Sequence, residues 1–366
     1  MRLAPPFVAL LFLGFAAAQA APTPPTQPAT GPGGADYAFA RVASHSLGSD
    51  SDAVTLFWPE KAAGQTLPVI IFAHGWGAVK SEHYLAWIHH LVRHGAIVLY
   101  PRYQKNLREQ PAAFTPNATV GVKQGLEWLT KQKDLPRADL ARLATVGHSA
   151  GGVIAANLAV TLPAAGLPAP KAVFSVEPAV IERDGKPLVP LADLAKISSA
   201  TLLLTLSGDQ DTLVGDTGAR HIYEATTAIP AAQKDWLELR SDDHGAPALV
   251  ATHRAPAAPL PGYQPPKREP PKGFLRKRIA EKAKERLAER GLDLDDSTQE
   301  PPVTDALDYY GTWRLFDALC AAAFEDKSRD VILGGSAAQL DMGKWSDGTP
   351  VKPLVRRSPA ASAPAP

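Results

Sequence analysis

The chain has 366 residues, of which 45% are hydrophobic and 20% are charged, and its formal net charge is +1. This length and hydrophobic content suffice for one large globular domain or two small ones, and the near-zero net charge gives no electrostatic case for nucleic-acid binding. The single cysteine, Cys320, excludes an intramolecular disulfide and a cysteine-based zinc site.

The first twenty residues have the pattern of a secretory signal peptide. Arg2 gives a positive start, residues 7–16 are apolar, and Ala-Gln-Ala at 18–20 is a small-x-small cleavage site. We expect cleavage after Ala20 and a secreted or periplasmic protein. A membrane anchor is the alternative, but the apolar run is short for a span. Residues 21–35 are rich in Pro, Thr and Gly, which predicts a disordered leader.

Strand and helix patterns alternate through the next part of the chain. Residues 54–58 alternate as a strand does, and the apolar run 67–73 is typical of a strand covered on both faces. A helix is predicted from Ser81, a strand at 96–100 and a second helix near 120–130. This order is typical of a parallel sheet.

The short apolar run 142–146 leads into Gly-His-Ser-Ala-Gly at 147–151, which fits the pattern G-x-S-x-G. Residues 153–160 are typical of a helix. We therefore expect Ser149 on a sharp strand-to-helix turn that strains its backbone and presents its hydroxyl. The flanking glycines leave room for this turn, and the N–H groups at the helix start can stabilise an oxyanion.

The alternation continues after this helix. Strands are predicted at 171–176, 201–206 and 235–239, with a helix at about 216–226 before the last of them. The fold class is therefore predicted to be α/β, with a mostly parallel central sheet and helices on both faces.

Residues 256–302 interrupt this pattern with many prolines and a charged helical stretch at 272–290. The apolar residues of that stretch lie four apart and form a narrow stripe: Leu275, Ile279, Ala283 and Leu287. We predict a surface insertion; the alternative is a lid or a weak contact with a membrane surface. Residues 36–255 and 303–356 are then the catalytic domain, and 357–366 are predicted to be a disordered tail.

Three residues with the chemistry of a catalytic triad each follow a predicted strand. Ser149, Asp211 and His244 lie just past the carboxyl ends of strands, where functional groups of a parallel sheet collect. We expect His244 to take the serine proton and return it to the leaving group, while Asp211 orients the imidazole. Asp209 and His253 are the competing acid and base; His253 lies further from its strand end.

The oxyanion of the reaction needs two N–H donors. Ala150, directly after the nucleophile, supplies the first, and Trp76, in the loop after the second predicted strand, is expected to supply the other. His74, Gly75 and His148 are expected to surround the substrate pocket, His74 by supporting the oxyanion loop and His148 by packing behind the turn.

Four histidines fall close together after residue 80. They could indicate a metal site, but an ordinary helix surface is the preferred interpretation of the four: His83, His89, His90 and His94. We expect no metal and no cofactor.

The order Ser, Asp, His is the order of the α/β-hydrolase fold. Three motifs accompany it: His-Gly-Trp-Gly at 74–77, Gly-His-Ser-Ala-Gly at 147–151 and Gly-x-x-Asp-x-x-Val at 208–214. With these motifs and the histidine after the last strand, the sequence resembles secreted serine esterases of the α/β-hydrolase superfamily. It is similar to their dienelactone-hydrolase, platelet-activating-factor acetylhydrolase and polyester-cutinase branches. The resemblance covers about 36–255, with 305–324 as a final helix.

This resemblance implies a carboxylic ester hydrolase that forms an acyl-enzyme on Ser149 and acts on a small-molecule or lipid-like ester. Two alternatives stay open. A serine peptidase of the prolyl-oligopeptidase type shares fold and triad, although no propeller precedes the core. A non-catalytic binding protein on the same fold is the other alternative, against which the complete Ser-Asp-His set argues.

Overall fold

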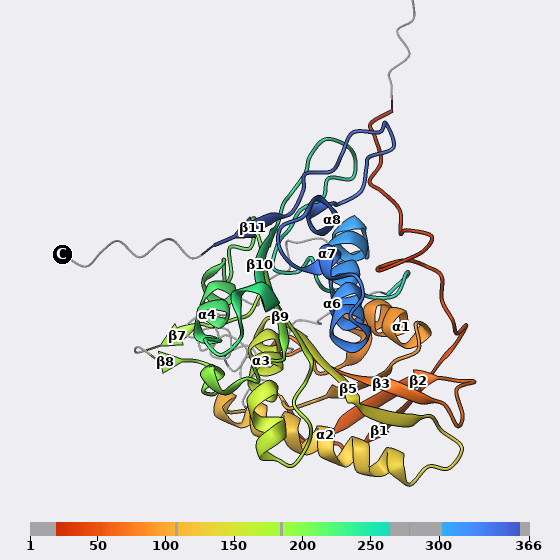
Figure 1. Ribbon diagram of the computed structural model, residues 1–366, viewed down its shortest axis with the longest axis vertical. Coiled ribbons are helices and arrows are strands. Elements are labelled where there is room, and N and C mark those ends of the chain that lie inside the picture. The colour runs from red at the N-terminus through yellow and green to blue at the C-terminus, as the bar shows by residue number, and fades with distance from the viewer. Residues whose placement is uncertain (1–19, 107–108, 184–185, 264–277, 279–301, 359–366) are drawn as a thin grey trace, which may run out of the picture.

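The structure, a computed structural model, describes residues 20–106, 109–183, 186–263, 278 and 302–358. Its centre is a nine-stranded sheet in the order β1-β2-β4-β3-β5-β6-β9-β10-β11 (Figure 1). The six strands from β4 to β10 in this order run parallel, and β1, β2 and β11 pair antiparallel at the two edges. The strands are β1 Val42–Leu47, β2 Val54–Pro59, β3 Thr66–Ala73, β4 Ile97–Pro101, β5 Arg137–His148, β6 Ala172–Val176, β9 Leu202–Gly208, β10 Lys234–Leu239 and β11 Val355–Arg357; β7 Glu182–Arg183 and β8 Lys186–Pro187 form a separate pair.

Two apolar cores cover the faces of the sheet, because successive side chains of a strand point to opposite faces. Phe72 and Val146 pack in the core that includes α1 and α6, whereas Ile71 and Leu143 pack in the core that includes α2 and α3. The helices are α1 Leu85–Arg93, α2 Phe114–Thr130, α3 Ala150–Ala164, α4 Thr217–Ala225, α6 Arg314–Glu325, α7 Arg329–Ile332 and α8 Ala337–Leu340, with 3₁₀ turns at Ser81–Tyr84, Pro111–Ala113, Leu194–Lys196 and Ala231–Gln233 and a π-helix at Leu307–Trp313. The predicted mostly parallel sheet with helices on both faces is confirmed.

The inner strands lie where the hydrophobic pattern predicts them, whereas the edge strands β1 and β11 have no clear pattern. β1 is half exposed and β11 has only three residues, Val-Arg-Arg. Charged, short edge strands are typical of sheets that avoid further pairing. β11 also extends to Arg357, which pairs with Trp236, so the predicted disordered tail does not begin at 357.

The leader at 21–35 is ordered, contrary to the prediction. The carbonyl of Pro22 accepts a hydrogen bond from Ala246 N at 2.8 Å, and the carbonyl of Thr23 accepts one from Ser346 N at 3.0 Å. Prolines lack an N–H and favour extended backbone, so the Pro-rich start of this segment bonds to distant loops, while hydrogen bonds within the segment form nearer its end, such as that from Gly34 N to Gly31 O. A Pro-rich composition therefore does not separate a disordered segment from one that packs along a surface.

The predicted insertion begins later than residue 256. Ala257 and Ala258 are buried in the core with α1, and the carbonyl of Ala258 accepts a hydrogen bond from Ala86 N at 2.9 Å. The first residues after 255 therefore belong to the folded body.

Several predictions concern segments outside the described residues. These are the signal peptide at 1–19, nearly all of the charged stretch at 272–290, and the end of the chain from 359. Within the part of the chain that the structure describes, no helix is long and apolar enough to cross a membrane.

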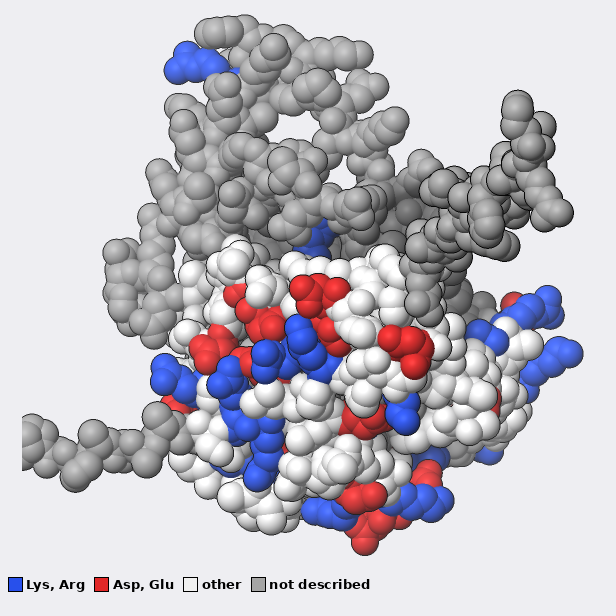
Figure 2. Space-filling model, turned by 90° about the horizontal axis from the view of Figure 1, so that it is seen from above, with Lys and Arg blue, Asp and Glu red and all other residues white. Residues whose placement is uncertain are grey.

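Charges of both signs lie beside one another on the face shown in Figure 2. The mixture of signs in the described part of that face agrees with the net charge of +1.

Two carboxyl groups at the start of the π-helix should make stability depend on pH. Burial raises the pKa of Asp305 to about 6, and burial together with the Asp305 charge raises that of Asp308 well above its usual range. An acid whose pKa is raised by folding stabilises the fold fully below its unfolded pKa, and this contribution is lost as the pH rises through the folded pKa. Between about pH 4 and 7, the unfolding free energy of the parent should therefore fall by roughly 1–3 kcal/mol more than that of Asp305→Asn.

The measurement is urea unfolding of parent and variant at both pH values. Asparagine keeps an oxygen that can accept the hydrogen bond from Leu307 N at 2.7 Å, so the variant removes only the charge. The exposed Asp326→Asn is the control and should follow the parent. Identical pH profiles for Asp305→Asn and the parent would contradict this account.

Candidate active site

Ser149 lies on the sharp turn between β5 and α3. Its backbone has φ 60° and ψ −124°, a strained conformation for a non-glycine residue. A Cβ at Gly147 would lie 2.1 Å from the carbonyl oxygen of Gly151, and one at Gly151 would lie 2.1 Å from that of Ala73. Only glycine fits at these two positions, so the pattern G-x-S-x-G is a steric requirement of this turn.

Ser149, His253 and Asp211 form a continuous hydrogen-bonded chain. His253 Nε2 lies 2.9 Å from Ser149 Oγ, and His253 Nδ1 lies 2.8 Å from Asp211 Oδ2. The other oxygen of Asp211 accepts hydrogen bonds from Leu213 N and Val214 N, which hold the carboxylate in place. The serine and the aspartate are almost fully buried, with 5% and 6% exposure. This is the arrangement of a nucleophile, a general base and an orienting acid.

His244 does not take part in this arrangement, so the structure contradicts the predicted base. Its Nε2 lies 2.8 Å from Asp347 Oδ2 and its ring packs near Trp345, with 37% of the side chain exposed. After β10, Asp242 and Leu249 pair in an isolated antiparallel bridge, and His244 sits in the loop that this bridge closes. The chain returns to the carboxyl end of β9 only after the bridge, which brings His253 to Ser149.

Asp209, the competing acid, stabilises the loop that brings the chain back to β9. Its Oδ1 accepts hydrogen bonds from the N–H and the hydroxyl of Ser241, and Arg240 forms an ion pair with its Oδ2. The Ser241 hydroxyl in turn accepts a bond from Ala251 N at 2.9 Å. Asp209 therefore holds the loop that carries His253 and does not contact the histidine.

In the loop after β3, two of three successive N–H groups are already hydrogen-bonded to side chains, and the third could bind an oxyanion. Gly75 N donates to Tyr84 Oη at 3.0 Å, and Gly77 N donates to Gln104 Oε1 at 2.8 Å. Among the described residues, Trp76 N–H has no acceptor. A Cβ on Gly75 would lie 3.5 Å from Ser149 Cβ, so this loop is adjacent to the nucleophile. Trp76 is thus placed to serve with Ala150, the first residue of α3.

His74 and His148, the histidines predicted to surround the pocket, form hydrogen bonds next to the site. His74 is fully buried, stacks on Tyr103 and bridges the carbonyls of Gly75 and Arg102 at 2.7 Å each. His148 Nδ1 lies 2.8 Å from Tyr84 Oη, and its ring lies 4.8 Å from that of His253. Both histidines therefore fix neighbouring catalytic groups.

Residues 32–190 match the family model described as Chlorophyllase, a family of ester hydrolases. The match spans the strained serine turn and the oxyanion loop, and the sheet around them has the strand order and helix layers described above. This chain has the α/β-hydrolase fold. The match supports a hydrolase of the serine-esterase type. A search of curated proteins found no match.

The α/β-hydrolase site contains a second carboxyl group that the sequence analysis missed. Glu177 follows β6 directly, is fully buried and has φ 43°. Its Oε2 lies 3.6 Å from His253 Nδ1 and 3.4 Å from His148 Nε2, without a hydrogen bond to any described residue. The rule that selected Asp211, a polar residue just past a strand end, would also have selected Glu177.

The two carboxyl groups have different surroundings. Burial raises the pKa of Glu177 well above its usual range, and the negative charge of Asp211 raises it further. Asp211 instead accepts three hydrogen bonds, from the histidine and two backbone groups. These surroundings favour the neutral form of Glu177, which leaves Asp211 to stabilise an imidazolium at His253.

Proposed function

We propose that this α/β-hydrolase cleaves carboxylic esters through an acyl-enzyme on Ser149. The observation that carries the proposal is the position of His253, within hydrogen-bond reach of both Ser149 Oγ and Asp211 Oδ2. A serine hydroxyl is a weak nucleophile until a base takes its proton, and His253 is the base placed to do so.

The reaction follows from these contacts. Ser149 Oγ attacks the ester carbon while His253 Nε2 takes its proton, and the N–H groups of Ala150 and Trp76 stabilise the oxyanion. The intermediate collapses, the C–O bond breaks, and His253 returns the proton to the leaving alcohol. Water then attacks the acyl-enzyme with the same base and releases the acid.

We further propose that the protein is secreted or periplasmic and that its substrate is a small-molecule or lipid-like ester. Cleavage after Ala20 is compatible with the ordered leader, whose residues from Pro22 onward are hydrogen-bonded to the folded body. A mature protein that begins at Ala21 keeps these contacts. N-terminal sequencing of the exported protein would test this.

Labelling with a fluorophosphonate tests the proposed nucleophile. The parent protein should be labelled and Ser149→Ala should not, while both keep the same unfolding midpoint. A panel of p-nitrophenyl esters and peptide anilides then separates the esterase from a peptidase of the prolyl-oligopeptidase type. Labelling that persists in Ser149→Ala, or the absence of any labelling of the parent, would reject the acyl-enzyme on Ser149.

A further inference from the structure

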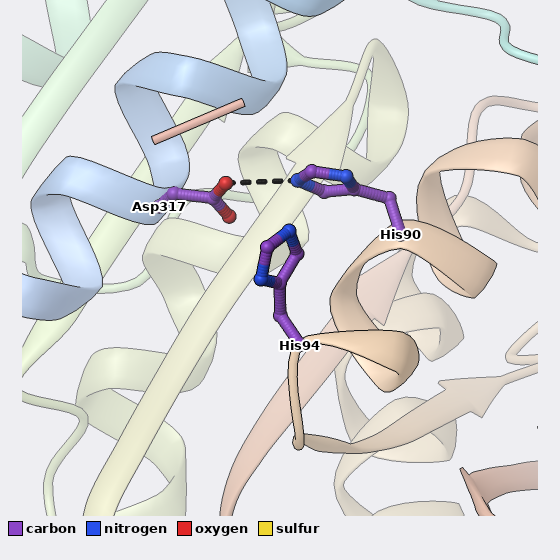
Figure 3. Close-up of side chains that lie close together, drawn as sticks. All are labelled: His90, His94 and Asp317. Carbon is purple, nitrogen blue, oxygen red and sulfur yellow. Dashed lines mark hydrogen bonds and ion pairs between the residues drawn. The ribbon is translucent and has the colours of Figure 1, made fainter. Parts of the chain in front are cut away.

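A second cluster of metal-ligating side chains lies between α1 and α6. His90 and His94 are one turn apart at the end of α1, and Asp317 faces them from the first turn of α6 (Figure 3). His90 Nε2 lies 2.8 Å from Asp317 Oδ2, and one ligand atom of each residue lies within 4.8 Å of the others. The cluster shares no residue with the Ser149 site.

His90 is buried and its two partners are half-buried, contrary to the expectation of an ordinary helix surface. His90 is 1% exposed, and its ring packs 4.5 Å from that of Trp313. The side chain of Asp317 is 17% exposed. Away from water, the nitrogen atoms of the two imidazoles and the oxygen atoms of the carboxylate each need a hydrogen-bond partner or a metal ion.

The leader closes over these side chains and supplies an outer layer of hydrogen bonds. Gly33 N donates to Asp317 Oδ2 at 2.7 Å, His94 Nε2 lies 3.0 Å from the carbonyl of Gly34, and Tyr37 Oη lies 3.2 Å from His90 Nδ1. A partner on the second ring nitrogen fixes the tautomer and orientation of a histidine, as is usual for histidines that bind metals.

We propose that His90, His94 and Asp317 form a binding site for a divalent metal ion of the zinc class. Two imidazole nitrogens and one carboxylate oxygen are the ligand types of Zn²⁺, whereas Ca²⁺ and Mg²⁺ prefer oxygen ligands alone. The fourth ligand is a water molecule, while the carbonyl of Gly34 keeps its hydrogen bond with His94 Nε2. Binding replaces the proton between His90 Nε2 and Asp317 Oδ2, and the ligand atoms move to about 3.3 Å apart, the separation in a tetrahedral zinc site.

Arg93, the residue before His94, has partners outside the cluster. Its guanidinium stacks over the ring of Tyr37 at 3.7 Å, and its Nε donates to the carbonyl of Phe39. A bound ion would join the leader, α1 and α6, three segments far apart in the sequence. We therefore assign the site a structural role.

The full mature chain, freed of metal with a chelator, is titrated with Zn²⁺ by calorimetry and with Co²⁺, whose visible absorption reports tetrahedral coordination. One ion should bind per chain, and a hundredfold excess over the dissociation constant should raise Tm by about 3–6 °C. His94→Gln and Asp317→Asn should each weaken Zn²⁺ binding at least about 100-fold. His89→Gln, on the same helix outside the cluster, is the matched control and should bind as the parent does.

A second trio must be distinguished, because ligand atoms of His148, Glu177 and His253 also lie within 4.8 Å of one another. Zn²⁺ binding that persists in His253→Ala and disappears in His94→Gln supports the proposal. Binding lost in His253→Ala but kept in Asp317→Asn, or no binding by the folded parent, would overturn it. His94 is partly exposed, and the amide oxygen introduced by Asp317→Asn can still accept from Gly33 N, so at least one variant should fold.

Discussion

Replacing His253 with alanine should lower kcat on a soluble p-nitrophenyl ester by roughly 10⁴–10⁶-fold, the range found when a triad histidine is removed. His253 Nε2 lies 2.9 Å from Ser149 Oγ, and among the described residues no other side chain forms a hydrogen bond with this oxygen through which it could take the proton. The oxyanion donors remain, so some activity above the uncatalysed rate should survive.

The matched variant is His244→Ala. His244 forms a partly exposed pair with Asp347, and such surface pairs contribute only about 0–1 kcal/mol to stability. Its kcat and unfolding midpoint should stay close to those of the parent. If His244→Ala were the inactive protein and His253→Ala the active one, the base assigned from the geometry would be wrong.

Replacing Asp211 with asparagine should lower kcat by up to about 10⁴-fold, whereas Glu177→Gln should retain most activity. The asparagine side chain can still accept from Leu213 N and Val214 N, but its NH₂ group toward His253 Nδ1 favours the tautomer with Nε2 protonated. That tautomer cannot accept the serine proton. Burial raises the pKa of Glu177 and so favours its neutral form, which glutamine matches in shape and charge.

A second measurement separates the two carboxyl groups independently of activity. The pKa of Glu177 is raised in the fold, so its contribution to stability is full below the unfolded pKa and is lost as the pH rises through the folded pKa. Glu177→Gln should therefore lose less stability than the parent at alkaline pH. An inactive Glu177→Gln together with a nearly normal Asp211→Asn would show that Glu177 orients His253.

Local pattern was sufficient for the inner sheet and for the nucleophile. The run at 67–73 became a strand buried on both faces because its side chains, apart from that of Pro68, each reach one of two apolar cores. The turn at Ser149 followed from its glycines, whose places are set by contacts within a few residues and with the adjacent β3 strand. Such short-range requirements are visible in a single sequence.

The histidine of the site and the buried Glu177 depended on contacts between distant segments. His244 was predicted as the base because it lies closer than His253 to the end of β10 along the chain. The Asp242–Leu249 bridge instead places His244 next to Asp347, and the chain after the bridge brings His253 to Ser149. The ordered leader and the cluster at Asp317 likewise arise from segments more than 200 residues apart. Sequence by itself determined the sheet, the serine turn and the types of residue at the strand ends. Tertiary structure decided which of those residues meet, because a loop's path is set by hydrogen bonds to partners far away in the chain.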